Sequence, residues 1–239
     1  MLIHRYRSLS LTLLLIANAC QLGTARADST EVPDTLEQRI APCTVCHGKQ
    51  GEGLEKPGYY FPRIGAKPAG YLFRQLVNFR EKRRYNVDMN YIVSYLSDAY
   101  LREIAEYFAN QRPALPGPTA PKGSKQGLLR AETLITKGDS SKGIPACMAC
   151  HGKALTGTQP AMPGLVGLPA YYIAAQLGAW RNGVRHADEP DCMGKIASRL
   201  SADDVSLLGA WLASQRASAD AAPAPARSAK LPMDCGDLK

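Results

Sequence analysis

The sequence has few histidines, little excess charge and no long apolar stretch beyond its N-terminal segment. Only four of its 239 residues are histidine, and the formal net charge is +8. Residues 1–27 hold three arginines and no acid, so the remainder carries 26 basic and 21 acidic residues, or +5. No apolar run approaches the ~20 residues that a membrane-spanning helix needs. This composition argues against a strongly basic nucleic-acid-binding protein and against a membrane-spanning bundle.

The N-terminus has the pattern of a targeting segment. Three basic residues near the start precede an apolar run over 9–17, and Ala25-Arg26-Ala27 is a small-x-small cleavage site. The pattern predicts a signal peptide at 1–27 and export to an oxidising compartment, the periplasm. An uncleaved anchor, or lipoprotein processing at Cys20, are the alternatives.

Four of the seven cysteines fall into two copies of one motif. Each copy is C-x-x-C-H, formed by Cys43, Cys46 and His47 and again by Cys147, Cys150 and His151. Two thiols at this spacing reach the two vinyl groups of one porphyrin, and the following histidine lies beneath the iron. The motifs predict two covalently attached haem c groups with His47 and His151 as axial iron ligands.

A zinc site or a redox dithiol explains the motifs less well. Zinc needs further cysteine or histidine ligands. The two remaining histidines are His4, inside the predicted signal peptide, and the isolated His186. A redox dithiol has no need of the histidine that follows each pair, so haem attachment is favoured.

The two halves of the chain are similar to each other. The separation along the chain from His47 to Met89 equals the separation from His151 to Met193. Between them, matching residues recur at a constant offset, such as Tyr71 with Tyr172. Such self-similarity indicates two copies of one domain.

The repeat, together with helical periodicity, predicts an all-α protein with two tandem haem domains. Ser97 and Ser201 are expected to cap matching helices. The predicted organisation is a signal peptide at 1–27, haem domain 1 at 28–112, a Pro-rich linker at 113–125, haem domain 2 at 126–216 and a flexible tail at 217–239.

Methionine is the expected second axial ligand of each iron. Met89 is the only methionine in 28–115, and it aligns with Met193. A thioether suits haem iron. Met89 is expected in a polar loop, where a methionine side chain would contribute little to a hydrophobic core. For the second iron, a Cys192 thiolate or His186 are competing ligands.

Two cysteines remain once the haem cysteines and Cys20 are set aside. Cys192 and Cys235 form an even remainder in a chain expected in an oxidising compartment. They are predicted to form a disulfide.

Five basic residues precede the Met89 segment: Arg74, Arg80, Lys82, Arg83 and Arg84. They are expected either to form a basic rim that steers an acidic redox partner or to be an ordinary solvated helix face.

The chain resembles class I dihaem cytochromes c of the c4 type. The resemblance rests on the two C-x-x-C-H motifs, the segment 163–167 and the matched blocks 89–108 and 193–212. It implies two tandem class I cytochrome c domains and a periplasmic carrier, often loosely membrane-associated. It also implies that the carbonyls of Pro62 and Pro163 accept the Nδ1–H of the haem histidines. Cys192 and the tail with Cys235 depart from the family pattern.

With both axial positions filled, the irons can only exchange electrons, so the predicted function is an electron carrier rather than an enzyme. The resemblance implies a haem–copper oxidase as the acceptor, and a quinol-oxidising complex or a dehydrogenase is the expected donor. The alternatives are the cytochrome subunit of a flavocytochrome sulfide dehydrogenase, although the sequence has no flavin motif, and a dihaem thiosulfate dehydrogenase. The latter needs a labile or thiolate ligand, for which Cys192 is the only candidate.

Overall fold

The computed structural model describes residues 34–216, 222–226 and 231–236. The predicted signal peptide at 1–27 lies outside these residues. Asp34–Lys239 form one compact unit. Within the described residues, no helix has the length and apolar character that crossing a membrane requires.

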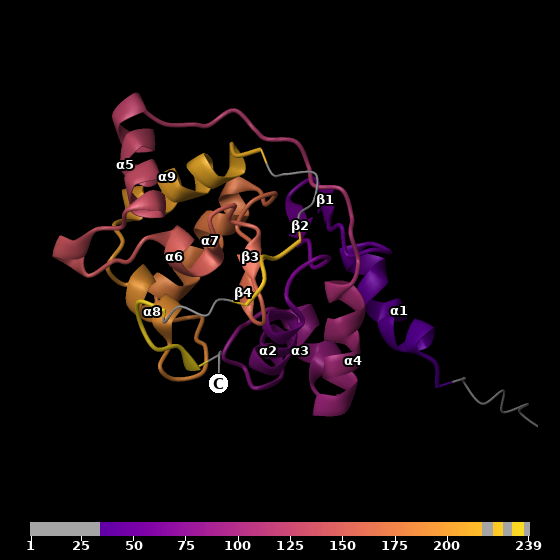
Figure 1. Ribbon diagram of the computed structural model, residues 1–239. Helices are drawn as coiled ribbons and strands as arrows, with labels where there is room; N and C mark the ends of the chain where they lie inside the picture. Colours follow the sequence, from indigo (N-terminus) through magenta and orange to yellow (C-terminus); the bar gives the residue numbers. More distant parts are fainter. Residues whose placement is uncertain (1–33, 217–221, 227–230, 237–239) are drawn as a thin grey trace, which may run out of the picture. The chain divides into compact units, whose positions relative to one another are not determined.

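The first repeat is a group of four helices around its own core, coloured indigo to magenta in Figure 1. They are α1 (Leu36–His47), α2 (Ala69–Arg80), α3 (Val87–Val93) and α4 (Asp98–Ala109). Leu101 and Phe108 of α4 are almost fully buried against Leu72 of α2 and Val93 of α3. The cysteines of the first motif therefore lie on α1, and Met89 lies on α3.

From its C-x-x-C-H helix onward, the second repeat has the same order of elements as the first, but a further helix, α5, precedes that helix. It comprises α5 (Lys125–Thr136), the short 3₁₀ turn Ser140–Lys142, α6 (Cys147–His151), α7 (Ala170–Arg181), α8 (Cys192–Ala197) and α9 (Ala202–Ala213). Its core includes the fully buried Leu134 and Ile135 of α5, packed with Leu208 and Leu212 of α9. The predicted helical repeat is therefore present in the structure, with a separate core for each copy.

Each repeat also contains a short antiparallel hairpin that helical periodicity did not predict. The first joins β1 (Leu54–Lys56) to β2 (Tyr59–Phe61), and the second joins β3 (Gly157–Thr158) to β4 (Met162–Pro163). Strands of two or three residues are too short to show an alternating pattern. Each hairpin follows a C-x-x-C-H helix and delivers the proline that contacts its histidine.

Side-chain caps fix where the later helices begin. Ser97 Oγ accepts a hydrogen bond from the backbone N of Tyr100, and Ser201 forms a complete capping box with Asp204. Both predicted caps are confirmed. Such caps satisfy backbone N–H groups that have no partner inside the helix.

Met89 and Met193 lie within short helices, not in open loops, which corrects the expectation for Met89. The Asn86 side chain accepts from the backbone N of Met89 at 3.0 Å and so begins α3. Asp191 accepts from Gly194 N at 2.8 Å and begins α8 in the same way. Caps of this kind help such short helices to form.

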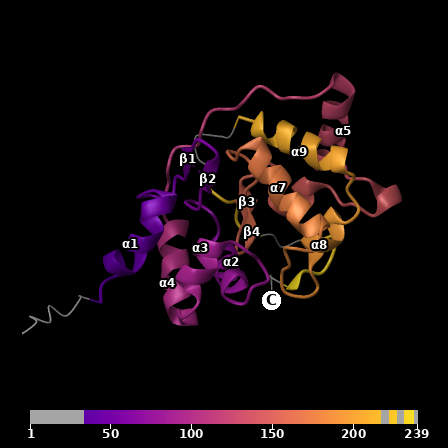
Figure 2. The same ribbon diagram turned by 180° about the vertical axis from the view of Figure 1, so that it is seen from behind.

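The chain between α4 and α5 runs as an extended segment (Figure 2). Arg63 secures its beginning by donating to the carbonyls of Pro113 and Ala114, at 2.8 and 2.9 Å. In the C-terminal segment, Ala224 donates to Gly157 O and accepts from Gln159 N. The described parts of the predicted flexible tail are thus bonded to the second repeat.

Candidate haem-binding sites

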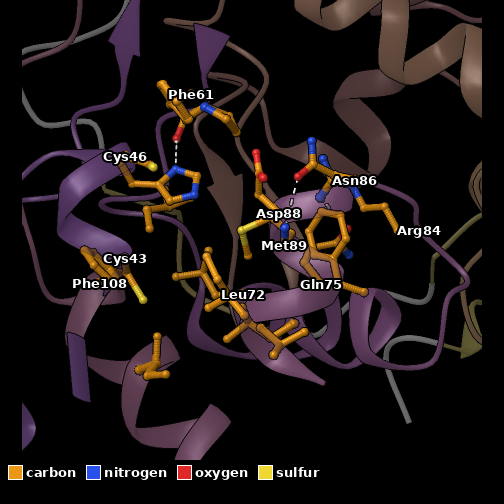
Figure 3. Close-up of a pocket in the computed structure, with 18 of the residues that line it drawn as sticks. Cys43, Cys46, Phe61, Leu72, Gln75, Arg84, Asn86, Asp88, Met89 and Phe108 are labelled. Carbon is orange, nitrogen blue, oxygen red and sulfur yellow. Dashed lines mark hydrogen bonds between the residues drawn. The ribbon is translucent and has the colours of Figure 1, made fainter. Parts of the chain in front are cut away.

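A cavity in the first repeat brings together the three residues of the first motif and Met89. Figure 3 shows Cys43, Cys46 and Met89 in its wall. Cys43, Cys46 and His47 come from the end of α1, and Met89 comes from α3. Most of the remaining wall is apolar and is formed by side chains that include Leu72, Leu76, Phe79, Ile92, Val93, Ile104 and Phe108.

His47 is held in the form that binds a metal. Its Nδ1 lies 2.7 Å from the carbonyl oxygen of Pro62, to which the Nδ1–H donates. The lone pair of a neutral ring is then on Nε2, the other nitrogen. Burial lowers the pKa of His47, which keeps the ring neutral at physiological pH.

The second cavity repeats this arrangement. Cys147, Cys150 and His151 line it from α6, and Met193 lines it from α8. The Nδ1 of His151 lies 2.8 Å from the carbonyl of Pro163, and burial lowers the pKa of His151 as well. The structure therefore brings all eight predicted haem-binding residues together as two sets of four.

The motif cysteines are suited to haem attachment rather than to zinc. None of the four is in a disulfide. Structural and catalytic zinc sites need three or more protein ligands, and no group of three histidine, cysteine or acidic side chains that could hold a metal ion is found among the described residues. Thioether formation needs only the two thiols, each of which adds its S–H group across a vinyl double bond.

The competing ligands for the second iron are not placed to act. Cys192 is bonded to Cys235 in a disulfide, with their Cα atoms 5.2 Å apart. His186 does not line the cavity, and its Nε2 hydrogen-bonds to the carbonyl of Gly183 at 2.8 Å. Met233, which sequence reasoning missed, does line the cavity. It is distant from Met193 along the chain and is brought there by the tail.

A symmetric cluster of arginines and glutamines joins the two repeats. Arg84 and Arg185 each donate to both Gln75 Oε1 and Gln176 Oε1, and the four distances are 2.7 to 2.9 Å. Arg185 is only 4% exposed and also lies 3.6 Å above the ring of Trp180. Gln75 and Gln176 recur at the same offset in the internal repeat as Tyr71 and Tyr172, but the repeat gave no sign that these side chains meet.

The cations of this cluster are not neutralised by acidic side chains. Among the described residues, neither Arg84 nor Arg185 forms an ion pair with a carboxylate. Lys67, which lines both cavities, hydrogen-bonds to a carbonyl, and burial lowers its pKa to about 8. Buried positive charge is costly unless it is paired.

The arrangement fits a porphyrin that carries carboxylates. Arg185 and Lys67 line both cavities, so a haem propionate in either one supplies the missing negative charge. The Trp180 Nε1 is the one buried side-chain nitrogen or oxygen, among the described residues, without a hydrogen-bond partner. It lies in the wall of the second cavity, where a bound carboxylate is able to accept from it.

The structure does not support the expected basic rim before Met89. Arg80 pairs with Asp98 at 2.7 Å, while Arg74 and Arg83 both pair with Asp188, at 2.9 and 3.0 Å. Arg84 belongs to the cluster between the repeats. Only Lys82 of the five is both exposed and outside the ion pairs described here. The sequence showed the charges but not the acids that neutralise them.

The fold and the two sites define a dihaem c-type cytochrome, an electron carrier whose partners are redox proteins. No protein-family model matches the chain. A thiosulfate dehydrogenase electron acceptor from Thiomonas intermedia is 37% identical over 73% of this chain and 79% of its own length. Cytochrome c4 from Pseudomonas aeruginosa is 32% identical over 86% of this chain and 95% of its own length. The chain belongs to the cytochrome c4 family and carries two covalent haem c groups.

Solved structures agree with this assignment. Reduced recombinant cytochrome c4 from Pseudomonas stutzeri matches 76% of this chain and 97% of its own, with a TM-score of 0.63 and 27% identity. The thiosulfate dehydrogenase TsdBA from Marichromatium purpuratum matches 72% of this chain with a TM-score of 0.61 and 30% identity. This chain spans 36% of that longer chain. The predicted all-α class I cytochrome c fold is confirmed.

Proposed function

We propose that the chain is a periplasmic electron carrier that accepts electrons from a thiosulfate dehydrogenase and passes them to a haem–copper oxidase or another acceptor. The observation that carries the proposal is that each cavity pairs a neutral imidazole with a methionine sulfur. Two such ligands fill both axial positions of an iron and leave no place for a substrate.

Each residue of a site has one part in this proposal. The cysteines, Cys43 with Cys46 and Cys147 with Cys150, form the thioethers. His47 and Met89 ligate the first iron, and His151 and Met193 ligate the second. When bound, haem supplies the one-electron Fe(III)/Fe(II) couple. The carbonyls of Pro62 and Pro163 fix the imidazole orientation, so oxidation and reduction require little movement of the chain.

The choice of donor follows from relatives. Two of them, from Thiomonas intermedia and Stutzerimonas stutzeri, are named thiosulfate dehydrogenase electron acceptors and are 37% and 36% identical to this chain. The disulfide at Cys192 also favours a carrier over an enzyme, because a disulfide-bonded sulfur has no thiolate to offer an iron. Export through a signal peptide at 1–27 fits the disulfide and the haem chemistry.

The test is reduction of the purified, oxidised dihaem protein by thiosulfate in stopped flow. With a catalytic amount of thiosulfate dehydrogenase present, both haems should become reduced, at a rate that rises with carrier concentration. Without the dehydrogenase, thiosulfate alone should leave the protein oxidised. The reduced protein should then be reoxidised by a membrane preparation that contains a haem–copper oxidase.

Two results would contradict the proposed function, and each contradicts a different part of it. Turnover of thiosulfate by the protein alone would make it an enzyme. Failure of the dehydrogenase to reduce it, alongside rapid reduction by another dehydrogenase, would overturn the proposed donor while leaving the carrier function in place.

A further inference from the structure

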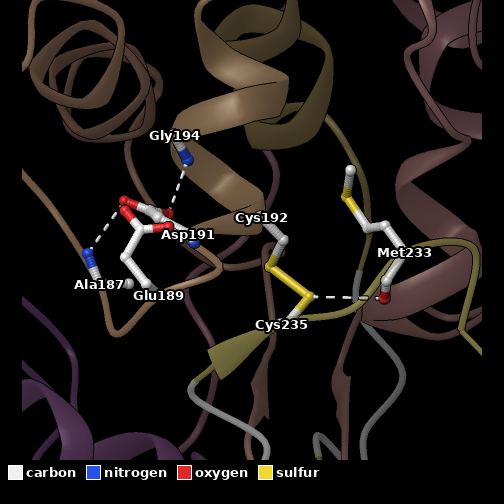
Figure 4. The surroundings of a disulfide bond; sticks show 7 residues. All are labelled: Ala187, Glu189, Asp191, Cys192, Gly194, Met233 and Cys235. Carbon is white, nitrogen blue, oxygen red and sulfur yellow. Dashed lines mark hydrogen bonds between the residues drawn. A yellow bond between two sulfur atoms is a disulfide. The ribbon is translucent and has the colours of Figure 1, made fainter.

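The segment that presents Met193 is covalently tied to the C-terminal tail. Cys192 is the first residue of α8 and is directly followed by Met193. Its disulfide partner, Cys235, lies 43 residues further along the chain (Figure 4). Any movement of the first turn of α8 away from the cavity must therefore displace the tail as well.

The tail is also packed tightly against the loop before Met193. Gly236 donates its backbone N–H to the carbonyl of Pro190 at 3.0 Å. A Cβ at Gly236 would lie 2.3 Å from the carbonyl oxygen of Asp188, so only glycine allows this approach. Cys235 itself is 6% exposed, and Cys192 is half-buried. Burial of Cys235 limits the access of thiol reductants to this bond.

The rest of the loop is held from two further directions. Asp191 accepts backbone hydrogen bonds from Ala187 and Gly194, at 2.9 and 2.8 Å (Figure 4). Asp188 pairs with Arg74 and Arg83 of the first repeat, at 2.9 and 3.0 Å.

The matching segment of the first repeat lacks the covalent link. Asp88 occupies the position before Met89 that Cys192 occupies before Met193. Asn86 and Asn90 hold that segment through side-chain hydrogen bonds to the backbone, including Asn86 N to Asn90 Oδ1 at 2.8 Å. Hydrogen bonds open and close with local fluctuations, whereas a disulfide does not.

We propose that the Cys192–Cys235 disulfide positions Met193 on the second iron, and that it makes this thioether harder to displace than Met89 on the first. The inference rests on the ligand assignment proposed above. Breaking a methionine–iron bond requires the short α8 to swing outward. The disulfide makes that open state rare, and the apparent affinity of a competing ligand falls with the population of the open state.

The test uses the oxidised dihaem protein and imidazole as the competing ligand. In the native protein, the methionine–iron charge-transfer absorption should decrease in two phases of equal size, the tighter one from the first haem. In the variant Cys192→Ala/Cys235→Ala, the weaker phase should shift to at least about tenfold lower imidazole concentration. The tighter phase should not move, because neither cysteine of the disulfide lines the first cavity.

Two further variants separate positioning from general stability. Ile135→Ala removes a fully buried side chain of the same repeat that does not line the cavity. Ile135→Ala and the double cysteine variant are compared at temperatures equally far below their unfolding midpoints. Under these conditions, Ile135→Ala should leave the imidazole concentration of the weaker phase unchanged. Met233→Leu should also leave it unchanged, which excludes Met233 as the ligand. Gly236→Ala, with the disulfide intact, should shift the weaker phase in the same direction as the double variant but less far.

The results distinguish an error in the ligand assignment from an error in the proposed role of the disulfide. If the native protein shows fewer than two methionine-ligated haems, the ligand assignment is wrong. If it shows two, and imidazole uptake by the second haem is unchanged in the double variant or equally changed in Ile135→Ala, the positioning role is wrong.

Discussion

Replacing Arg185 with methionine tests whether haem carboxylates neutralise the cluster between the repeats. Arg185 donates at 2.7 Å to both Gln75 and Gln176 and lies 3.6 Å above Trp180. Arg84 continues to donate to both glutamine oxygens in the variant, so neither is left without a donor. If no haem propionate occupies the cluster, the substitution also removes repulsion between the neighbouring cations Arg84 and Arg185. The free energy of unfolding would then fall only slightly or even rise.

If haem propionates occupy the cluster, the same substitution destabilises the protein. Removing one partner from a buried ion pair costs about 3–5 kcal/mol, because the other charge stays buried and unpaired. For a chain of this size, about 2–4 °C is lost per kcal/mol. Arg185→Met should therefore lower the Tm of the dihaem protein by roughly 10 °C. It should also lower the reduction potentials of both haems, because Arg185 lines both cavities and a cation favours the reduced state.

Calorimetry of the dihaem protein, together with a redox titration, measures both effects. Arg181→Met is the matched control. Arg181 is an exposed arginine of α7 that donates to the carbonyl of Leu200, and its loss should cost about 1 kcal/mol at most. An unchanged or higher Tm in Arg185→Met, with unmoved potentials, would show that the cluster holds no carboxylate.

Two further predictions concern the second repeat. The Ser141 hydroxyl and the Arg130 guanidinium lower the pKa of Asp139 to about 2. Because the folded-state pKa is depressed, this contribution is complete above about pH 4 and is lost as the pH falls toward 2. The acid-unfolding midpoint of Arg130→Met, followed by circular dichroism, should lie at higher pH than that of the native protein, and an identical midpoint would contradict this. Thr158→Val removes the buried hydrogen bond from Thr158 Oγ1 to Cys150 O, 2.6 Å long, and should cost about 1–3 kcal/mol in urea unfolding. An unchanged urea midpoint would contradict the second prediction.

The local parts of the sites were predictable from sequence because their chemistry is local. The C-x-x-C-H spacing identifies thiols and imidazole on one turn, and the equal separation of Met89 and Met193 from their motif histidines identifies the opposite ligands. The caps at Ser97 and Ser201 were predictable for the same reason, since a cap acts within the first turn of its helix.

The parts that were missed depend on contacts between distant segments. The pairing of Arg185 with Gln75 joins positions 110 apart in the sequence, and the ion pair of Arg74 with Asp188 joins positions 114 apart. The hydrophobic periodicity of a sequence does not indicate side-chain partners that are this far apart along the chain. Met233 lines the second cavity in a segment that the Cys192–Cys235 disulfide and the Gly236–Pro190 hydrogen bond hold in place, and no sequence motif marks these contacts.

Counting haems and their methionine ligands in the purified, oxidised protein tests the central claim most directly. The expected result is two covalent haems per chain, a methionine–iron charge-transfer absorption equivalent to two irons, and no carbon monoxide uptake by the reduced protein as isolated. A single haem per chain, or a reduced form that binds carbon monoxide readily, would contradict the assignment of two closed, electron-transferring sites.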